Sequence, residues 1–323
     1  MHSITRKLFL YHTALFAGGF AGTAEAGTPA GTVSLAYIAR LYSMKLKIFG
    51  KKAVMENRYN KVEIETNSRR AWINGVMIWL HSACRKSGSD WTIREADFKR
   101  GIDPILRTYA YAPGRMPRLV VLDPGHGGKD TGSISPKGYR EKDLVLDISY
   151  RVRKLLEAKG IRVKMTRTGD TYPNLDVRST YAYKVGADLF ISIHANAAGA
   201  PSASGVETFI TSSTGYDSTN AYGQDQDTFA FKNNTYDALN AVLGFSIHSN
   251  VVKMSKRDDR GLRRARYSVL KHTRCPAALV ECGFLTNPDE EILLNTSSYR
   301  ESIARGISNG VLGYFTLVKR ALR

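Results

Sequence analysis

The residues best suited to chemistry in this 323-residue chain are two histidines and two glutamates: His126, His194, Glu141 and Glu281. His126 follows the apolar run "LVVLD", His194 ends "DLFISIH", and Glu281 ends "PAALVE". Two histidines and one carboxylate with an open fourth position form a common catalytic zinc site. A second carboxylate beside such a site takes a proton from water and returns it to the leaving amine during metal-assisted hydrolysis.

The positions of these residues on predicted elements favour a shared site. Ligands of open α/β sheets bind beyond the carboxyl ends of the strands, and Glu141 begins a predicted helix whose first turn suits a carboxylate. Each residue also has a structural interpretation: Glu141 as an ordinary first-turn acid, and His194 as a hydrogen-bonded core histidine. A purely structural interpretation is less suited to Glu281, because an unpaired charge in "AALVEC" is costly to bury. Three other histidines are interpreted as structural or surface residues: His81, His248 and His272.

The elements that must position these residues alternate between strands and helices from residue 118 onward. Apolar runs predict strands over 118–123, 161–167, 187–197, 205–211 and 275–287. Helical spacing predicts helices over 141–160, 175–186, 233–254 and 298–318. This alternation predicts an α/β domain over 118–323, with a mostly parallel sheet flanked by helices on both faces.

A different pattern precedes this domain. Short strand-like runs cover 45–50, 52–57, 61–66 and 70–80, and Asn74-Gly75 in the last run predicts a tight hairpin. Helical patterns at 35–43 and 94–106 bracket the strands. We therefore expect a small β-rich α+β domain over 27–106, joined by a linker at 107–117 that contains two prolines and a glycine.

Charge and composition restrict the partners. The hydrophobic content of 43% is that of a globular protein, but the formal net charge of +18 predicts attraction to nucleic acid, a membrane surface or cell wall. Residues 27–116 hold 16 Lys and Arg against 7 Asp and Glu, whereas residues 117–323 hold 29 against 21. The small domain is thus more basic per residue and is the expected binding surface, although solvated charges without a ligand are the alternative.

The N-terminus has the pattern of an export signal. Residues 1–26 have a basic start, an apolar stretch of about fifteen residues and "AEA", which is typical of a cleaved secretory signal. The stretch is short for a membrane span, so we expect no stable membrane insertion, with an uncleaved anchor as the alternative. An exported protein seldom meets chromosomal DNA, which argues against nucleic acid as the partner. We expect a periplasmic protein, or alternatively a secreted extracellular one.

The three cysteines are expected to be free core residues: Cys84, Cys275 and Cys282. In an extended strand the last two would lie about 23 Å apart at ~3.3 Å per residue. A disulfide requires Cα atoms within about 7 Å, so this pair should not bond.

Residues 118–317 resemble the zinc-dependent N-acetylmuramoyl-L-alanine amidases of the amidase-3 family. The matching stretches are "VVLDPGHGGKDTG", "EKDLVLDIS", "MTRTGDTYPNLDVR", "ADLFISIHANA", "DRGLRRARYSVLK" and "PAALVECGFLTNPDEE". The resemblance implies one Zn²⁺ bound by His126, Glu141 and His194, with Glu281 as the catalytic carboxylate. It further implies hydrolysis of the amide between N-acetylmuramic acid and L-alanine, and substrate contacts for Asn196 and Arg260.

One segment departs from some members of that family, in which an inserted helix carries a glutamate that caps the zinc. Residues 208–280 contain no glutamate, so we expect no such autoinhibition, although Asp217, Asp225 or Asp227 could substitute. The insertion 212–236 is predicted to be a loop bordering the cleft. Its aromatic residues would either contact glycan or peptide, or pin the loop to the domain: Tyr216, Tyr222, Phe229 and Tyr236.

The first domain resembles, through "TVSLAYIARLYSMKLKIFGKKAVM" and "INGVMIWL", the copper-amine-oxidase N-terminal-like domain of wall-associated proteins. No His or Cys cluster there suits copper, and we expect a wall-targeting module. The whole chain is predicted to release stem peptides from peptidoglycan during wall remodelling or daughter-cell separation. The alternatives are a catalytically inactive peptidoglycan-binding protein of the same fold and a zinc peptidase acting on other amides. A wall or envelope activator is compatible with the sequence as a further partner.

Overall fold

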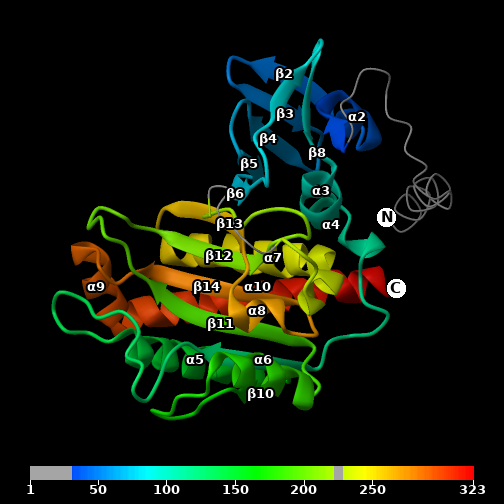
Figure 1. Ribbon diagram of the computed structural model, residues 1–323. Coiled ribbons are helices and arrows are strands. Elements are labelled where there is room, and N and C mark those ends of the chain that lie inside the picture. Colours follow the sequence, from blue (N-terminus) through cyan, green and yellow to red (C-terminus); the bar gives the residue numbers. More distant parts are fainter. Residues whose placement is uncertain (1–30, 222–227) are drawn as a thin grey trace.

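The computed structural model describes residues 31–221 and 228–323 (Figure 1). The predicted signal peptide, residues 1–26, lies outside the described residues. In the described part of the chain, no helix is both long enough and apolar enough to cross a membrane.

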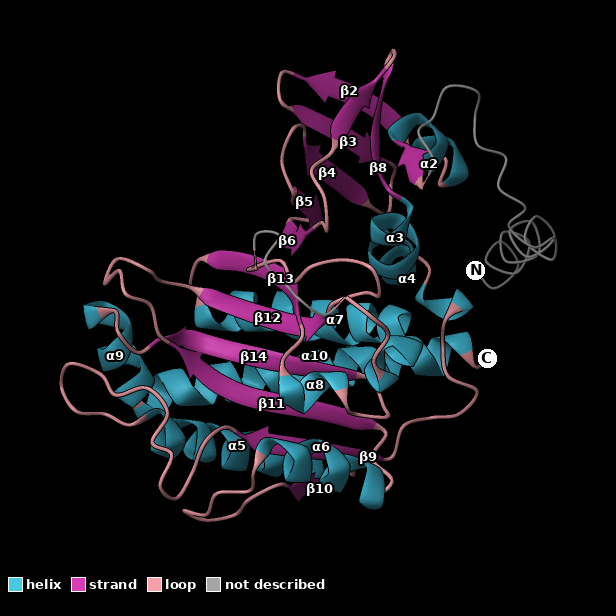
Figure 2. Cartoon of the chain, in the orientation of Figure 1, coloured by secondary structure: helices cyan, strands magenta, loops and turns pink. Residues whose placement is uncertain are grey.

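Six strands form the sheet that carries the candidate site. In spatial order they are β10 (Arg162–Met165), β9 (Leu119–Pro124), β11 (Leu189–Asn196), β14 (Ala277–Phe284), β12 (Val206–Thr211) and β13 (Asp259–Ala265). Their apolar runs are buried because helices cover both faces of the sheet. The pairs are parallel except β12 with β14, which is antiparallel, as the arrowheads in Figure 2 show.

Two helical layers cover this sheet. On one face lie α5 (Glu141–Glu157), α7 (Asp237–Ser255) and α10 (Ser297–Ala321), packed on one another and on the strands. On the other face, α6 (Leu175–Lys184) and the short α8 (Ser268–Lys271) pack against a second core. A further helix, α9 (Pro288–Asn295), follows β14. The predicted helices on both faces are thus confirmed.

A β-rich unit precedes the sheet. It contains β1 (Thr32–Ser34), α2 (Leu35–Leu41), β2 (Lys45–Phe49), β3 (Lys52–Glu56), β4 (Lys61–Glu65), β5 (Arg70–Ile73), β6 (Val76–Trp79), β7 (Arg85–Ser87) and β8 (Asp90–Arg94). Short helical segments follow: α3 (Glu95–Asp97), η1 (Phe98–Ile102), α4 (Asp103–Leu106) and η2 (Thr108–Ala110). The predicted hairpin is confirmed, since Asn74 (φ 52°) and Gly75 (φ 83°) form the turn between β5 and β6.

The β-rich unit continues the sheet instead of standing apart from it. Strand β6 pairs in parallel with β13 at Ile78 and Leu262, and β2–β6 extend from there as an antiparallel meander. Figure 1 shows this unit standing over the β13 edge. The backbone pairing is supported by the Trp79 indole N–H, which donates to the Arg260 carbonyl at 2.8 Å. A separate three-stranded sheet has the order β1-β8-β7.

Two features of the sheet differ from the sequence expectation. A mostly parallel sheet was expected for residues 118–323, where four of the five described neighbouring pairs are parallel. Because the sheet continues into the β-rich unit, five of its ten described pairs are antiparallel and the eleven-stranded sheet as a whole is mixed. Strand β13 is absent from the predicted strands because its sequence "DRGLRRA" carries four charges and no alternation. Its burial comes from contacts with neighbours remote in sequence, which local patterns do not contain.

Candidate metal centre and active site

The turn that follows β9 brings His126 against His194, and three glycines make room for it. A Cβ on Gly125 would lie 2.3 Å from the His194 ring, and one on Gly132 would lie 2.6 Å from Glu141 Oε2. His126 itself has φ 58°, a conformation that few non-glycine residues adopt. The third glycine, Gly127 at φ 124°, passes so close to Thr171 that a Cβ would meet its carbonyl at 2.1 Å.

Two buried arginines hold this turn in place. Arg178, 2% exposed, donates to the carbonyl oxygens of Pro124 and His126 at 2.7 and 2.6 Å, and also pairs with Asp123 at 2.8 Å. Arg167 donates to the Gly125 carbonyl at 2.7 Å. Planar guanidinium groups with several donors suit such clusters of carbonyls. Sequence reasoning gave neither arginine a role, although both lie in the family motif "MTRTGDTYPNLDVR".

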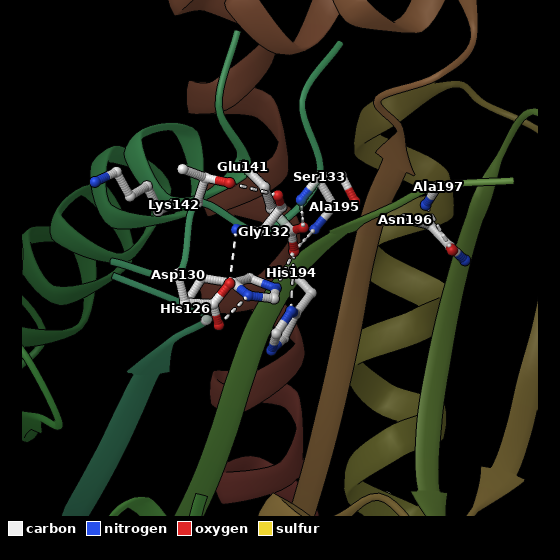
Figure 3. A network of polar contacts seen from close by, with 12 residues as sticks. His126, Asp130, Gly132, Ser133, Glu141, Lys142, His194, Ala195, Asn196 and Ala197 are labelled. Carbon is white, nitrogen blue, oxygen red and sulfur yellow. Dashed lines mark hydrogen bonds and ion pairs between the residues drawn. The ribbon is translucent and has the colours of Figure 1, made fainter. Parts of the chain in front are cut away.

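Three of the predicted site residues meet in space (Figure 3). Glu141 Oε1, at the start of α5, lies 3.1 Å from His126 Nε2 and 2.9 Å from His194 Nδ1. The ligand atoms of the three side chains all lie within 4.8 Å of one another, which is close enough for one metal ion. The two imidazole rings stand nearly perpendicular, with centroids 4.9 Å apart.

Neighbouring groups orient these side chains. Asp130 Oδ2 contacts His126 Nδ1 at 2.8 Å, which directs Nε2 of the same ring toward Glu141. The Ser133 and Ala195 amides donate to Glu141 at 2.9 and 3.0 Å. Burial alone would raise the pKa of Glu141, but hydrogen bonds from His126 and His194 outweigh it and hold that pKa well below its usual range. Glu141 is therefore a charged ligand candidate despite its burial.

Glu281 lies beside this group on the neighbouring strand. It is the register partner of His194 across the parallel β11–β14 pair, so the two side chains leave the same face of the sheet. Its Oε2 is buried and has no hydrogen-bond partner in the described part of the chain. Burial, then the nearby carboxylates of Glu141 and Glu207, raises the pKa of Glu281 well above its usual value. A buried carboxyl with a raised pKa next to other titratable groups is a candidate proton carrier.

The side chains of His194 and Glu281 on neighbouring strands form a row across the sheet, and Glu207 and Arg260 continue this row. Glu207 is the register partner of Glu281 across β12–β14, and its Oε1 accepts from Arg260 Nε at 2.5 Å. The Arg260 guanidinium also lies over the Phe284 ring, 4.7 Å from its centroid. Asn196 lies further along β11, apart from the histidines in Figure 3, and its side chain accepts from the Ala197 amide. The structure thus brings Arg260 into this row and leaves Asn196 outside the cluster of ligands.

The described part of the loop after β12, residues 212–221 and 228–236, does not border this site, so for these residues that expectation was wrong. Because β12 runs antiparallel to β14, its carboxyl end lies at the sheet edge opposite His194 and Glu281. There Tyr216 stacks on His81, with ring centroids 4.6 Å apart. Asp217 lies beside them, and Phe229 packs on Phe231, also away from the site. Tyr222, Asp225 and Asp227 lie outside the described residues, and Tyr236 lines another cavity at this far edge.

One of the three histidines set aside in the sequence, His248, and the three cysteines have the structural environments expected of them. His248 is fully buried in α7 and contacts Thr208 Oγ1 and Asp259 Oδ1 at 3.1 and 2.8 Å. The cysteines Cys84, Cys275 and Cys282 are free and buried, as predicted.

Comparison with known proteins gives the family of the chain. Residues 120–312 match the profile of the amidase-3 family, described as N-acetylmuramoyl-L-alanine amidase. The chain is 40% identical over 220 residues to the N-acetylmuramoyl-L-alanine amidase AmiA of Salmonella typhimurium, covering 61% of this chain and 76% of the relative.

Solved structures give the same result. An N-acetylmuramoyl-L-alanine amidase from Clostridium difficile 630 superposes with a TM-score of 0.52 at 34% identity, covering 62% of this chain and 98% of that one. The CwlD amidase from Clostridioides difficile, solved in complex with the GerS lipoprotein, superposes with a TM-score of 0.51 at 28% identity and the same coverage. The family match covers more than half of the chain, and the chain belongs to the amidase-3 family of N-acetylmuramoyl-L-alanine amidases.

Proposed function

We propose that this amidase is zinc-dependent and cleaves the amide between N-acetylmuramic acid and L-alanine in peptidoglycan, releasing stem peptides. The observation that supports this most directly is the convergence of His126, Glu141 and His194 next to the buried Glu281. Such activity would serve cell-wall remodelling or daughter-cell separation.

The donor set fits zinc. Two imidazoles and one carboxylate are borderline to hard ligands of the kind Zn²⁺ accepts, and no described cysteine lies among them. The contact between Asp130 and His126 Nδ1 is the carboxylate–histidine arrangement that fixes a metal-binding tautomer. When bound, Zn²⁺ would polarise the substrate carbonyl and make water a stronger nucleophile. The ligands in this proposal are His126, Glu141 and His194, for one ion.

Glu281 is proposed as the general base and acid. Its carboxylate would accept a proton from the attacking water and deliver it to the amine nitrogen of L-alanine as the carbon–nitrogen bond breaks. The raised pKa favours the first of these transfers, because a carboxylate of higher pKa is a stronger base toward the attacking water. Arg260 is proposed to contact the substrate from the row beside Glu281, and Asn196 from the end of β11.

The remaining parts of the chain are assigned by the same proposal. Residues 1–26 would be a signal peptide, 107–117 a linker and 118–323 the catalytic domain of an exported, periplasmic or secreted, enzyme. Residues 27–106 would be a wall-targeting domain held partly by charge. Because the similar CwlD amidase was solved with a lipoprotein, we infer that an envelope protein is a candidate activator here as well.

Digestion of purified peptidoglycan tests the catalytic proposal. The wild-type protein with zinc should release free stem peptides, whereas a chelator should abolish release and Glu281→Gln should lower the rate by about 10²–10⁴. Zinc content measured on the same Glu281→Gln sample should equal that of the wild type. Muropeptides with intact lactyl–alanine bonds would indicate a zinc peptidase, and wall binding without release would indicate an inactive binding protein.

Deletion of residues 27–106 tests the targeting proposal. Sedimentation with peptidoglycan sacculi should fall at low salt, and the difference from the full chain should shrink as salt screens the charges. Unchanged sedimentation at low salt would contradict a targeting role. Circular dichroism of the shortened protein serves as the control, because removal of β6 exposes the β13 edge.

A further inference from the structure

A cavity of about 350 Å³ lies where the β-rich unit meets the loop after β12. In the described part of the chain it is lined by Arg69, His81, Ser82 and Arg94 on one side and by Gly215, Tyr216 and Asp217 on the other. Since His81 follows β6 and Tyr216 follows β12, the cavity lies at the sheet edge opposite the candidate active site. Its volume is within the range of cavities that bind small ligands.

His81 is the residue that points to a ligand. Its side chain lines the cavity and is 9% exposed, with its ring stacked on Tyr216 at an interplanar angle of 22°. Neither ring nitrogen has a hydrogen-bond partner among the described residues. A buried imidazole with no partner costs free energy, whereas a bound group that accepts from it would remove that cost. The backbone N–H of His81 donates to Asp97 at 2.7 Å, which holds the main chain at this position.

The charge around His81 indicates an anionic ligand. Burial, and then the guanidinium groups of Arg264, Arg69, Arg266 and Arg100, lowers the pKa of its imidazole well below the usual value. Two arginines, Arg69 and Arg94, line the cavity itself, against one carboxylate there, Asp217. The described lining of the cavity is therefore net positive.

Two of these groups are placed to receive such a ligand. Arg69 Nε donates to the Leu80 carbonyl at 2.9 Å, which holds its side chain along the cavity wall. Arg94 is exposed and forms no ion pair with any other described residue. Planar guanidinium groups bind carboxylate and phosphate oxygens through paired hydrogen bonds.

We propose that this cavity binds the anionic oxygens of a carboxylate or phosphate group, contacted by Arg69, Arg94 and His81. The site is separate from the amidase centre and does not depend on zinc. Free carboxylates of peptides and phosphates of anionic polymers share this chemistry. Occupation of the cavity would join the β-rich unit to the loop after β12, because each contributes one wall.

Isothermal titration of the full-length, metal-loaded protein tests the site with three probes: inorganic phosphate, succinate and uncharged succinamide. Phosphate or succinate should bind, and Arg94→Gln should weaken binding about tenfold or more, the loss expected when one charged hydrogen bond is removed. Succinamide should not bind. Tighter binding of phosphate than of succinate would identify a phosphoryl ligand, and the reverse order a carboxylate.

Arg58→Gln provides the matched control, with the same change of charge in the same unit. Arg58 lies in the β3–β4 turn, where Asn60 accepts from the Asn74 side chain just before β6, at the end of that strand away from His81. The Arg58→Gln change should therefore leave affinity within about twofold if local contacts outweigh net charge. His81→Asn should also weaken binding. Equal affinity of the wild type, Arg94→Gln and His81→Asn, absence of anion binding, or equal binding of succinamide would each overturn the proposal.

Discussion

At the scale of residues, the candidate site contains two buried carboxylates whose pKa values are shifted in opposite directions by their surroundings. Glu141 and Glu281 are both buried, yet histidine contacts lower the pKa of the first while burial raises the pKa of the second. A ligand must be ionised to hold a cation, and a proton carrier must be able to bind a proton. Their different environments suit the two glutamates to these two proposed roles.

Asp130 should tune metal affinity although it would not bind the metal. Asp130→Asn replaces the acceptor at His126 Nδ1 with a group that can no longer hold the same tautomer by charge, so zinc affinity should fall about 10–100-fold. Competition with a zinc-binding dye measures this directly. Asp143→Asn removes the same charge from an Arg140 ion pair on the surface of α5 and should leave affinity unchanged. Equal affinities for both variants would contradict the role of Asp130.

At the scale of elements, the turn after β9 positions the site through its glycines. Gly132 combines φ 63° with close approach to both Glu141 and His126, so its replacement has two costs. Gly138 has φ 84°, but nothing lies within 4 Å of the position that a Cβ would take there, so its replacement has only the backbone cost. The two positions therefore separate conformational strain from steric displacement of the ligands.

Gly138→Ala should lower the free energy of unfolding by about 1–2 kcal/mol, the cost of a left-handed alanine. Gly132→Ala should lower it further and should also weaken zinc binding, because the new methyl group pushes Glu141 and the His126 ring apart. Chemical denaturation and zinc titration of both variants measure the two effects. If Gly132→Ala bound zinc like Gly138→Ala, the close approach would have no role in building the site.

At the scale of the whole molecule, the β-rich unit and the catalytic sheet share buried charge. Asp97, on α3, is 3% exposed and accepts from the His81 amide, and Arg264 of β13 donates to the Arg100 carbonyl at 2.7 Å. Burial raises the pKa of Asp97 to about 6. Because the charge of Arg264 on β13 acts on Asp97, the contact between the two units should respond to pH in the acidic range.

Ionisation of the buried Asp97 carboxyl should lower the free energy of unfolding as pH rises. Below pH about 4 the carboxyl is protonated in both folded and unfolded chains; between about 4 and 6 the unfolded chain loses that proton first, so the free energy of unfolding falls. The full loss, reached above pH 6, is about 3 kcal/mol. Asp97→Asn keeps the acceptor for the His81 amide and should gain that amount relative to wild type between pH 4 and 7. Parallel denaturation profiles of the two proteins across this range would refute the assignment.

The sequence by itself determined which residues are candidates for the site and most of the elements around them. His194 and Glu281 could be proposed because each ends an apolar run, His126 because it follows one, and Glu141 because it opens an amphipathic helix. The Asn74-Gly75 turn was equally predictable, because few residues other than these adopt positive φ at both positions. These features are local, because each depends only on residues that are close together in the sequence.

Only the tertiary structure decided in which direction the strands pair and which groups the buried arginines contact. The antiparallel direction of β12 moves its loop from the active-site edge to the opposite one, and no local pattern specifies strand direction. In the sequence, Arg178 resembles an exposed helix residue. In the folded chain it pairs with Asp123 and donates to the His126 carbonyl, which are 55 and 52 residues away in the sequence. His81 is an isolated histidine in the sequence until the folded chain places it among arginines. These properties arise from contacts between distant segments, and burial changes charge and hydrogen bonding only once those contacts form.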